Sequence, residues 1–182
     1  MQKTVDVVGA GLAGSECALQ LADRGVRVRL HEQRPVRMSP AHHTDRFAEL
    51  VCSNSLKSTK PETAAGVLKW ELGAMGCRLL PIAQDCSVPA GGALAVDREK
   101  FSDAVTNAVM SHPLIEVVRE EVTRIPEGPS VIAAGPLCSD ALFEAVSQAV
   151  GEGSMSFFDA AAPIVSAESI DRSIAFSQSR YE

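Results

Sequence analysis

One stretch near the start of the chain, Val5 to Glu32, constrains the fold more than any other. The valines of 5–8 predict a short strand, and the apolar positions of 26–30 predict a second strand that ends at Glu32. Between them lie a glycine-rich turn over 9–14 and a segment with helix-forming composition. A strand, a glycine turn, a helix and a strand in this order indicate the first unit of an α/β domain with a parallel sheet.

The glycines of this turn have separate physical roles in a site for a dinucleotide. Gly9 allows a tight exit from the strand, Gly11 has no Cβ and lets the backbone approach a diphosphate, and Gly14 lets the helix pack on the strand. The free N–H groups at the start of the helix then face the phosphates. Glu32 lies 18 residues after Gly14, where the fingerprint has an acid that accepts a hydrogen bond from an adenosine ribose hydroxyl. We expect the cofactor to contact the whole turn: Gly9, Ala10, Gly11, Leu12, Ala13 and Gly14.

A GxGxxG sequence alone is weak evidence, because glycine turns are common in α/β proteins. Here the predicted strand precedes the turn and the acid follows it, so dinucleotide binding is favoured over a purely structural turn. The fingerprint does not separate FAD from NAD. Its position at the start of the chain favours FAD by analogy with flavoproteins that hold two dinucleotides.

Composition places the chain among ordinary globular proteins. It has 182 residues, of which 46% are hydrophobic and 22% are charged, enough for one domain with its own core. There is neither an apolar run of about 18 residues nor a basic leader followed by an apolar segment, so we expect a cytoplasmic protein without a membrane segment. The five cysteines include no CxxC pair, which favours neither a disulfide framework nor a zinc site.

The net charge of −6 by itself argues against nucleic-acid binding. The charge is unevenly distributed, because residues 1–60 carry 9 lysines and arginines against 6 acids, whereas residues 61–182 carry 8 against 17. The basic surplus surrounds the glycine turn and the loop after it. A patch that serves cofactor phosphates explains this surplus as well as one that serves RNA.

Cys52 differs from the other cysteines in its neighbours. An apolar run over 47–51 stops at Cys52 and a cluster of small polar residues over 53–55, which favour turns. Beside Arg46 and Lys57, a cysteine at the rim of such a turn could be reactive. A buried thiol at the end of a strand is the alternative, and spacing alone favours that reading.

The segment over 33–46 is polar and broken by prolines, which predicts a loop. Its neighbouring His42 and His43 have no third ligand at a suitable spacing, so a metal site is not favoured.

The rest of the chain predicts alternating helices and strands. Helices are expected over residues 61–75, with an inward apolar stripe, after the capping residue Asp97, and over 139–150. Strands are expected over residues 93–96, 114–118, 122–125 and 130–135. The last strand is apolar on both faces, as a buried parallel strand would be. If it returns beside the first strand, its carboxyl end meets the same crevice, and Ala134 and Gly135 are expected to contact the cofactor.

Several longer blocks in order resemble one known family. They are GAGLAGSE (Gly9–Glu16), PAHHTDRFAELVCSNSLKS (Pro40–Ser58), VPAGGALAVDREKFS (Val88–Ser102), HPLIEVVREEV (His112–Val122) and FFDAAAPIV (Phe157–Val165), with SRY (Ser179–Tyr181) at the end. Together they resemble the folate- and FAD-dependent tRNA (uracil-5-)-methyltransferases, the TrmFO family, once called Gid. The match covers essentially all 182 residues.

This resemblance implies a Rossmann-like FAD-binding fold of the two-dinucleotide flavoprotein type and a function in tRNA modification. In the family, methylenetetrahydrofolate supplies a carbon, FAD carries it and supplies reducing equivalents, and NAD(P)H recharges the flavin. The product is 5-methyluridine in the T-loop of tRNA. Cys52 matches the flavin-side cysteine of the family, which is expected to act as nucleophile, proton acceptor or shield of the activated flavin.

The resemblance also implies how the chain is organised. The family is considerably longer, so we expect an N-terminal portion whose fold is incomplete at the C-terminus and includes part of an inserted second domain. The expected parts are a fingerprint unit (1–35), an inserted loop and helical region (36–90), a return to the sheet (91–150) and the start of a substrate domain (151–182). A complementary C-terminal half is an implied partner besides tRNA. A fragment that binds FAD without catalysing transfer, and a general FAD/NAD oxidoreductase, are the alternatives.

Overall fold

The computed structural model describes residues 4–151 and 166–175. Its main sheet has four strands in the order β6-β2-β1-β7, and all of their pairings are parallel. The strands are β1 (Thr4–Val8), β2 (Arg27–Glu32), β6 (Ile115–Arg119) and β7 (Ser130–Ile132). Val7 pairs with Leu30 on one side and with Val131 on the other, which fixes the register at the centre of the sheet.

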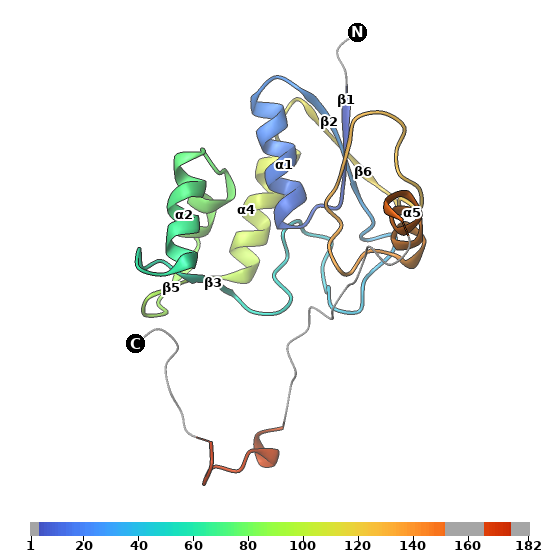
Figure 1. Ribbon diagram of the computed structural model, residues 1–182. Coiled ribbons are helices and arrows are strands. Elements are labelled where there is room, and N and C mark those ends of the chain that lie inside the picture. Colours follow the sequence, from blue (N-terminus) through green and yellow to red (C-terminus); the bar gives the residue numbers. More distant parts are fainter. Residues whose placement is uncertain (1–3, 152–165, 176–182) are drawn as a thin grey trace.

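Helices lie on both sides of this sheet (Figure 1). α1 (Leu12–Asp23) and α4 (Arg98–Met110) lie on one side, and α5 (Asp140–Val150) lies on the other. Helices on both faces of a parallel sheet define a Rossmann-like α/β arrangement. The fold class predicted from the sequence is confirmed.

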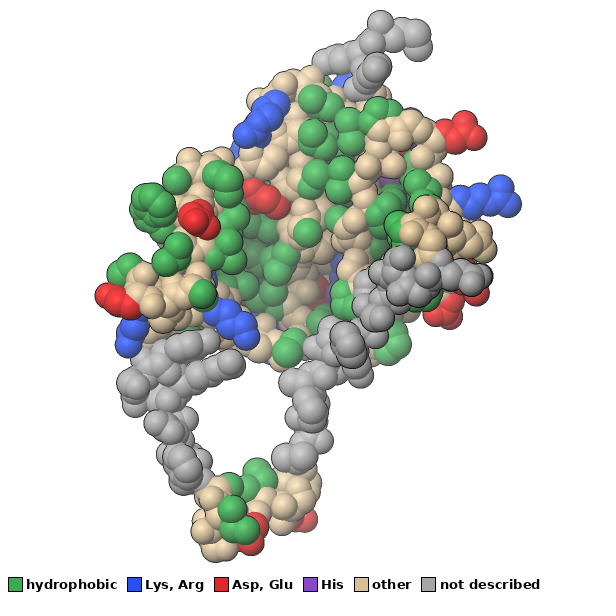
Figure 2. Space-filling model, in the orientation of Figure 1, with side chains coloured by type: hydrophobic (Ala, Val, Ile, Leu, Met, Phe, Trp, Pro, Cys, Tyr) green, Lys and Arg blue, Asp and Glu red, His purple; other side chains and the backbone are tan. Residues whose placement is uncertain are grey.

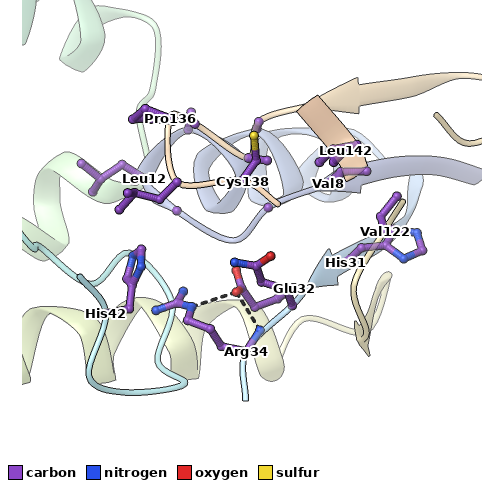
Figure 3. A pocket seen from close by; sticks show the side chains of 18 of the residues that line it. Val8, Leu12, His31, Glu32, Arg34, His42, Val122, Pro136, Cys138 and Leu142 are labelled. Atoms are coloured by element: carbon purple, nitrogen blue, oxygen red, sulfur yellow. Dashed lines mark hydrogen bonds and ion pairs between the residues drawn. The ribbon is translucent and has the colours of Figure 1, made fainter. Parts of the chain in front are cut away.

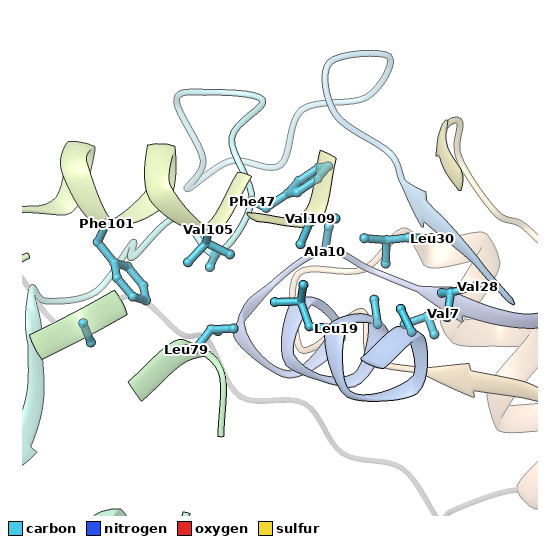
Figure 4. Packing of buried hydrophobic residues seen from close by; sticks show 14 of the residues in the cluster. Val7, Ala10, Leu19, Val28, Leu30, Phe47, Leu79, Phe101, Val105 and Val109 are labelled. Atoms are coloured by element: carbon cyan, nitrogen blue, oxygen red, sulfur yellow. The ribbon is translucent and has the colours of Figure 1, made fainter. Parts of the chain in front are cut away.

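The main core lies where the sheet meets α1 and α4 (Figure 4). Its most deeply buried large hydrophobic side chains come from β1, β2, α1, α4 and two other segments, and they are Val7, Val28, Leu30, Leu19, Phe101, Val105, Val109, Phe47 and Val96. Complete burial of an aliphatic or phenyl side chain of this size stabilises a fold by about 1.5–3 kcal/mol. This packing holds β1, β2 and α1 in fixed positions relative to one another.

Helix α4 begins directly after Asp97, where the sequence predicted a helix start. The carboxylate of Asp97 accepts hydrogen bonds from the backbone N–H groups of Glu99 and Lys100, at 3.2 and 3.1 Å. This side chain satisfies two of the N–H groups that a helix leaves without partners at its start. Asp97 is the cap that the sequence predicted.

A smaller antiparallel sheet, in the order β3-β5-β4, lies beside the main layers. Its strands are β3 (Ser55–Ser58), β4 (Ser87–Val88) and β5 (Ala93–Val96), and its helices are α2 (Ala64–Ala74) and α3 (Leu79–Asp85). Glu16 of α1 connects the two parts, because its carboxylate accepts from the backbone N–H of Arg78 at 2.9 Å and of Leu79 at 2.8 Å. The Glu16 side chain of α1 therefore caps the start of α3 and joins the smaller sheet region to the main one.

The predicted inward stripe of α2 is wrong. Val67, Leu68 and Met75 are 44%, 53% and 66% exposed, and hydrophobic side chains gather over this helix in Figure 2. Gly66 is the buried residue instead, and a Cβ there would lie 1.8 Å from the carbonyl oxygen of Lys60. The helix thus packs closely on the turn before it at Gly66, while its apolar stripe stays exposed.

Two other expectations need correction. Residues 122–125 form no strand. β7 is parallel to β1 as predicted, but it is an edge strand that ends at Ile132, and Val131 is 38% exposed. An apolar run can belong to an edge strand, because burial depends on what covers the strand as well as on its composition.

The described residues include the short 3-10 turn Ala167–Ser169, and most of the expected substrate-domain segment over 151–182 lies outside them. Among the described residues, no helix has the length and apolar character needed to cross a membrane.

Candidate cofactor site

The glycine turn between β1 and α1 is held by close backbone contacts. Gly9 has φ +98°, and a Cβ there would lie 2.6 Å from the Cα of Ala134. A Cβ on Gly14 would lie 1.7 Å from the carbonyl oxygen of Gly9. Both positions require glycine, since any side chain would push the turn away from β7 or from α1.

Gly11 differs from the other two glycines of the fingerprint. It is the N-cap of α1, with φ −71° and ψ −167°, a conformation open to any residue. A Cβ there would meet no atom within 4 Å. The space beside Gly11 is therefore free for a ligand, and the absence of a side chain is not needed for folding.

The start of α1 faces this open space without a side chain to cap it. Gly11 makes no side-chain cap, and the first turn of α1 holds no acidic residue. The first N–H groups of a helix lack intrahelical partners and carry the positive end of its dipole. An anionic group such as a diphosphate fits this position.

A cavity of about 270 Å³ opens at the carboxyl ends of β1 and β2 (Figure 3). It is lined by the glycine turn, the end of β2, the loop that follows it, the loop after β7 and the start of α5. The residues that line it include Gly9, Gly11, Leu12, Ala13, Glu32, Arg34, His42, Val51, Ala134, Gly135 and Leu142. Cofactors of open parallel sheets bind at this end of the strands.

Glu32 lies on the cavity wall with its carboxylate fixed. Its Oε2 accepts from the backbone N–H of Ala10 at 2.9 Å. Its Oε1 accepts from the backbone N–H of Arg34 at 3.0 Å and from Arg34 Nε at 2.8 Å. Burial alone would raise the pKa of Glu32, but these hydrogen bonds and the Arg34 charge together lower it. The carboxylate is therefore ionised at neutral pH.

Arg34 joins Glu32 to the loop that follows β2. Its side chain is almost fully buried, and its Nη1 lies 3.1 Å from Glu49 Oε2 and 3.2 Å from the carbonyl oxygen of Thr44. Glu49 also accepts from the backbone N–H of His43 at 2.9 Å and from the Thr44 hydroxyl at 2.8 Å. Burial opposes ionisation of Glu49, yet these hydrogen bonds hold its pKa below the ordinary value.

His42 reaches the same cavity from the loop (Figure 3). Its Nδ1 lies 2.6 Å from the hydroxyl oxygen of Ser39. Burial lowers the pKa of His42, and the nearby Arg34 charge lowers it further. His42 is therefore a neutral, polar wall of the cavity at neutral pH.

The loop itself is anchored on the glycine turn and the core. The backbone N–H of Ala48 donates to the carbonyl oxygen of Ala10 at 2.9 Å. The guanidinium of Arg119 lies 4.4 Å from the ring centre of Phe47, a cation–π contact. The same guanidinium donates to the carbonyl oxygen of Arg34 at 2.8 Å, so β6 also holds the loop in place.

A comparison with protein families bears on the identity of this fold and site. The family model described as glucose inhibited division protein A matches residues 4–182. The chain belongs to the glucose inhibited division protein A (GidA) family.

Curated relatives support the same assignment for this GidA-family chain. Over 181 residues it is 56% identical to a Bacillus subtilis protein named methylenetetrahydrofolate–tRNA-(uracil-5-)-methyltransferase TrmFO, an alignment that covers 100% of this chain and 42% of the relative. A relative of the same name from Lysinibacillus sphaericus is also 56% identical, with 41% of its length covered. The resemblance drawn from the sequence blocks is confirmed. The chain spans less than half the length of these relatives.

Solved structures include a GidA-related protein from Thermus thermophilus, with a TM-score of 0.41 and 19% identity over 75% of this chain and 54% of that one. The Diels-Alderase PyrE3 has a TM-score of 0.45 and 16% identity over 73% of this chain and 32% of its own.

The structure of the GidA-family chain brings most of the predicted cofactor residues together. Gly9, Gly11, Leu12, Ala13, Glu32, Ala134 and Gly135 line one cavity. Ala10 lies behind it, fully buried, and presents its N–H to Glu32. Gly14 contributes through the packing of α1 on the turn.

Cys52 lies outside the set of residues that line this cavity. Its neighbour Val51 is part of the wall, but Cys52 is in an exposed bend before β3. The reading as a buried thiol at the end of a strand is therefore wrong. The Cys52 thiol is exposed to solvent next to a residue of the cavity wall.

Sequence reasoning missed Arg34 and His42 as parts of the cavity. Both lie in a segment whose polar, proline-broken sequence predicts only a loop. Their positions follow from the ion pair of Arg34 with Glu49 and from the contact between Ala48 and Ala10, neither of which has a local signal. Within the described ranges, no three histidine, cysteine or acidic residues are arranged to hold a metal ion.

Proposed function

We propose that this chain is the FAD-binding part of an enzyme that forms 5-methyluridine in the T-loop of tRNA, with methylenetetrahydrofolate as carbon donor. The observation that carries the proposal is the 56% identity to relatives named for this reaction, together with a cavity built on the glycine turn. In the proposed reaction NAD(P)H reduces the flavin. The remaining machinery would come from sequence that corresponds to the uncovered part of those relatives.

The residues of the cavity fit FAD. The uncapped start of α1 and the open space at Gly11 suit a diphosphate, held by the N–H groups of the turn. Glu32 is an ionised acceptor at the end of β2, as an adenosine ribose requires. Ala134 and Gly135, on the loop after β7, would border the rest of the cofactor.

Bound reduced FAD would carry the one-carbon unit and supply the hydride that completes the methyl group. The residues of this chain would bind the cofactor, orient it and present a thiol beside it. Cys52 is proposed to take part in the transfer, and as a nucleophile its thiolate would add to C6 of the uracil. That addition forms an S–C6 bond, breaks the C5–C6 double bond and places negative charge on C5, which makes C5 nucleophilic.

A binding module without transfer activity is the second candidate. The observation that favours it is that the chain spans 42% of the length of its relative from Bacillus subtilis. In this case FAD would bind, but no methyl group would reach tRNA.

Titration of the purified chain with FAD, followed by flavin fluorescence and absorbance, tests the proposal. Saturable binding is the expected result, and a folded chain that does not bind FAD would refute both candidates. A transfer assay on tRNA, with the missing portion supplied by a relative, then separates them. Transfer that drops sharply in Cys52→Ala supports the enzyme, whereas no transfer under any reconstitution supports the binding module.

A further inference from the structure

We propose that Arg34 is a positioning residue of the cofactor site, which leaves one oxygen of Glu32 aimed at the ligand and fixes the loop over 42–49 beside it. The proposal rests on the proposed function, since it assigns the ligand of Glu32 to a hydroxyl of bound FAD. It concerns a residue outside the glycine fingerprint.

The hydrogen bonds of Glu32 determine where its free acceptor position lies. An ionised carboxylate has about four lone-pair positions, two on each oxygen. Both positions on Oε1 are used by Arg34, through its backbone N–H and its Nε. Oε2 accepts from Ala10 alone among the described residues. The remaining position is therefore on Oε2, the oxygen at the glycine turn.

The same guanidinium holds the loop. Arg34 Nη1 bonds to Glu49 Oε2 at 3.1 Å and to the Thr44 carbonyl oxygen at 3.2 Å. Glu49 in turn accepts from the backbone of His43 and Thr44. One buried cation thus joins the end of β2 to the loop that carries His42 into the cavity.

The charges that face Glu32 come from several elements. Arg34 and His42 belong to the loop after β2, and Arg119 comes from β6. His31 of β2 and Glu120, directly after β6, line the same cavity. Glu32 and Glu49 share the Arg34 guanidinium, so its removal leaves one buried and one partly buried acid without their common partner. Burial then favours the protonated form of Glu32, which is a weaker acceptor for the ligand hydroxyl than the carboxylate.

The test is FAD affinity as a function of pH for the wild type, Arg34→Gln and Glu32→Gln. Between about pH 8 and about pH 5.5, the wild type should change less than about twofold, whereas Arg34→Gln should lose about fivefold or more, because the pKa of its Glu32 is no longer lowered by the guanidinium. Glu32→Gln should bind more weakly at every pH, with a flat profile. A purely structural role for Arg34 predicts a loss in Arg34→Gln that does not depend on pH.

Arg34→Lys keeps the charge and provides the test if Arg34→Gln does not fold. Its readout is the carboxyl ¹³C titration of Glu32 in the chain without FAD, where we expect a higher midpoint than in the wild type because a lysine cannot make the same paired contacts. An unchanged midpoint, or a pH-independent affinity in Arg34→Gln, would overturn the proposal. Failure of the wild type to bind FAD would instead refute the proposed function, and the two failures are distinct.

Discussion

The carbonyl oxygen of Gly9 lies where a Cβ on Gly14 would have to be, only 1.7 Å from that position. This contact joins the exit of β1 to the first turn of α1 and fixes how closely the helix approaches the sheet. Gly11, between these two glycines, has open space instead. Two residues of the fingerprint thus serve the fold, and the third leaves space at the start of α1.

Gly14→Ala should therefore destabilise the chain even without a ligand. The added methyl group collides with backbone, which cannot move without displacing α1, and we expect a loss of about 3 kcal/mol or more. Urea unfolding followed by circular dichroism measures this loss. A variant within about 0.5 kcal/mol of the wild type would show that the turn adapts easily.

Gly11→Val should fold normally and bind FAD poorly. The side chain fills the space at the start of α1, and we expect at least a tenfold loss of affinity, about 1.4 kcal/mol. Gly73→Ala is the matched control, because its Cβ would lie 3.8 Å from Leu80, in ordinary contact and outside the cavity. Equal FAD affinity in Gly11→Val and the control would show that the glycine turn is not the binding site.

Phe101 and Trp70 should differ strongly in their effect on stability. Phe101 is fully buried against the main core, so Phe101→Ala should lose about 3–5 kcal/mol. Trp70 is 75% exposed on α2, and Trp70→Ala should remain within about 0.5 kcal/mol of the wild type. Denaturant midpoints of the two variants give the comparison. A large loss in Trp70→Ala would indicate a packing role that its exposure does not predict.

Cys52 should be the first thiol to react with a maleimide. It is exposed, whereas the other four cysteines are partly buried and burial raises the pKa of each: Cys17, Cys77, Cys86 and Cys138. The thiolate is the reactive form, so these four should react more slowly. Mass spectrometry after brief labelling identifies the site, and Cys52→Ala should remove the fast phase. Fast labelling that persists in this variant would place the accessible thiol elsewhere.

Acid should destabilise the chain through carboxylates that are partly buried and hydrogen-bonded in the fold. The pKa of Glu16 lies below its ordinary value of 4.5, because hydrogen bonds from Arg78 and other donors outweigh the opposing effect of burial. A depressed pKa stabilises the fold above the unfolded value, and this stability is lost as the pH falls through the folded value. Urea midpoints should therefore decrease below about pH 4.5. Glu16→Gln should show a smaller decrease on acidification, and an identical decrease would assign the effect to other acids.

Spacing and residue type were sufficient to predict the elements that depend on neighbouring residues in the sequence. The strand, turn, helix and strand of 5–32, the Asp97 cap and the short strand Ala93–Val96 could be predicted from spacing and residue type. Which face of a helix packs inward was less predictable. The stripe of α2 has helical spacing but three of its residues are exposed, because burial depends on which other elements pack against a helix as well as on its own periodicity.

Patterns in the sequence were enough to predict the Rossmann-like unit, its family and most of the residues that line the cavity at the glycine turn. These depend on patterns within a few residues, where glycine, strand and acid spacing have direct physical causes. Three features could be seen only in the folded chain: Arg34 joins Glu32 to Glu49, His42 enters the cavity, and Cys52 is exposed. Those outcomes depend on how a loop without local periodicity folds back on the sheet, and its position is determined by ion pairs and packing between residues far apart in the sequence.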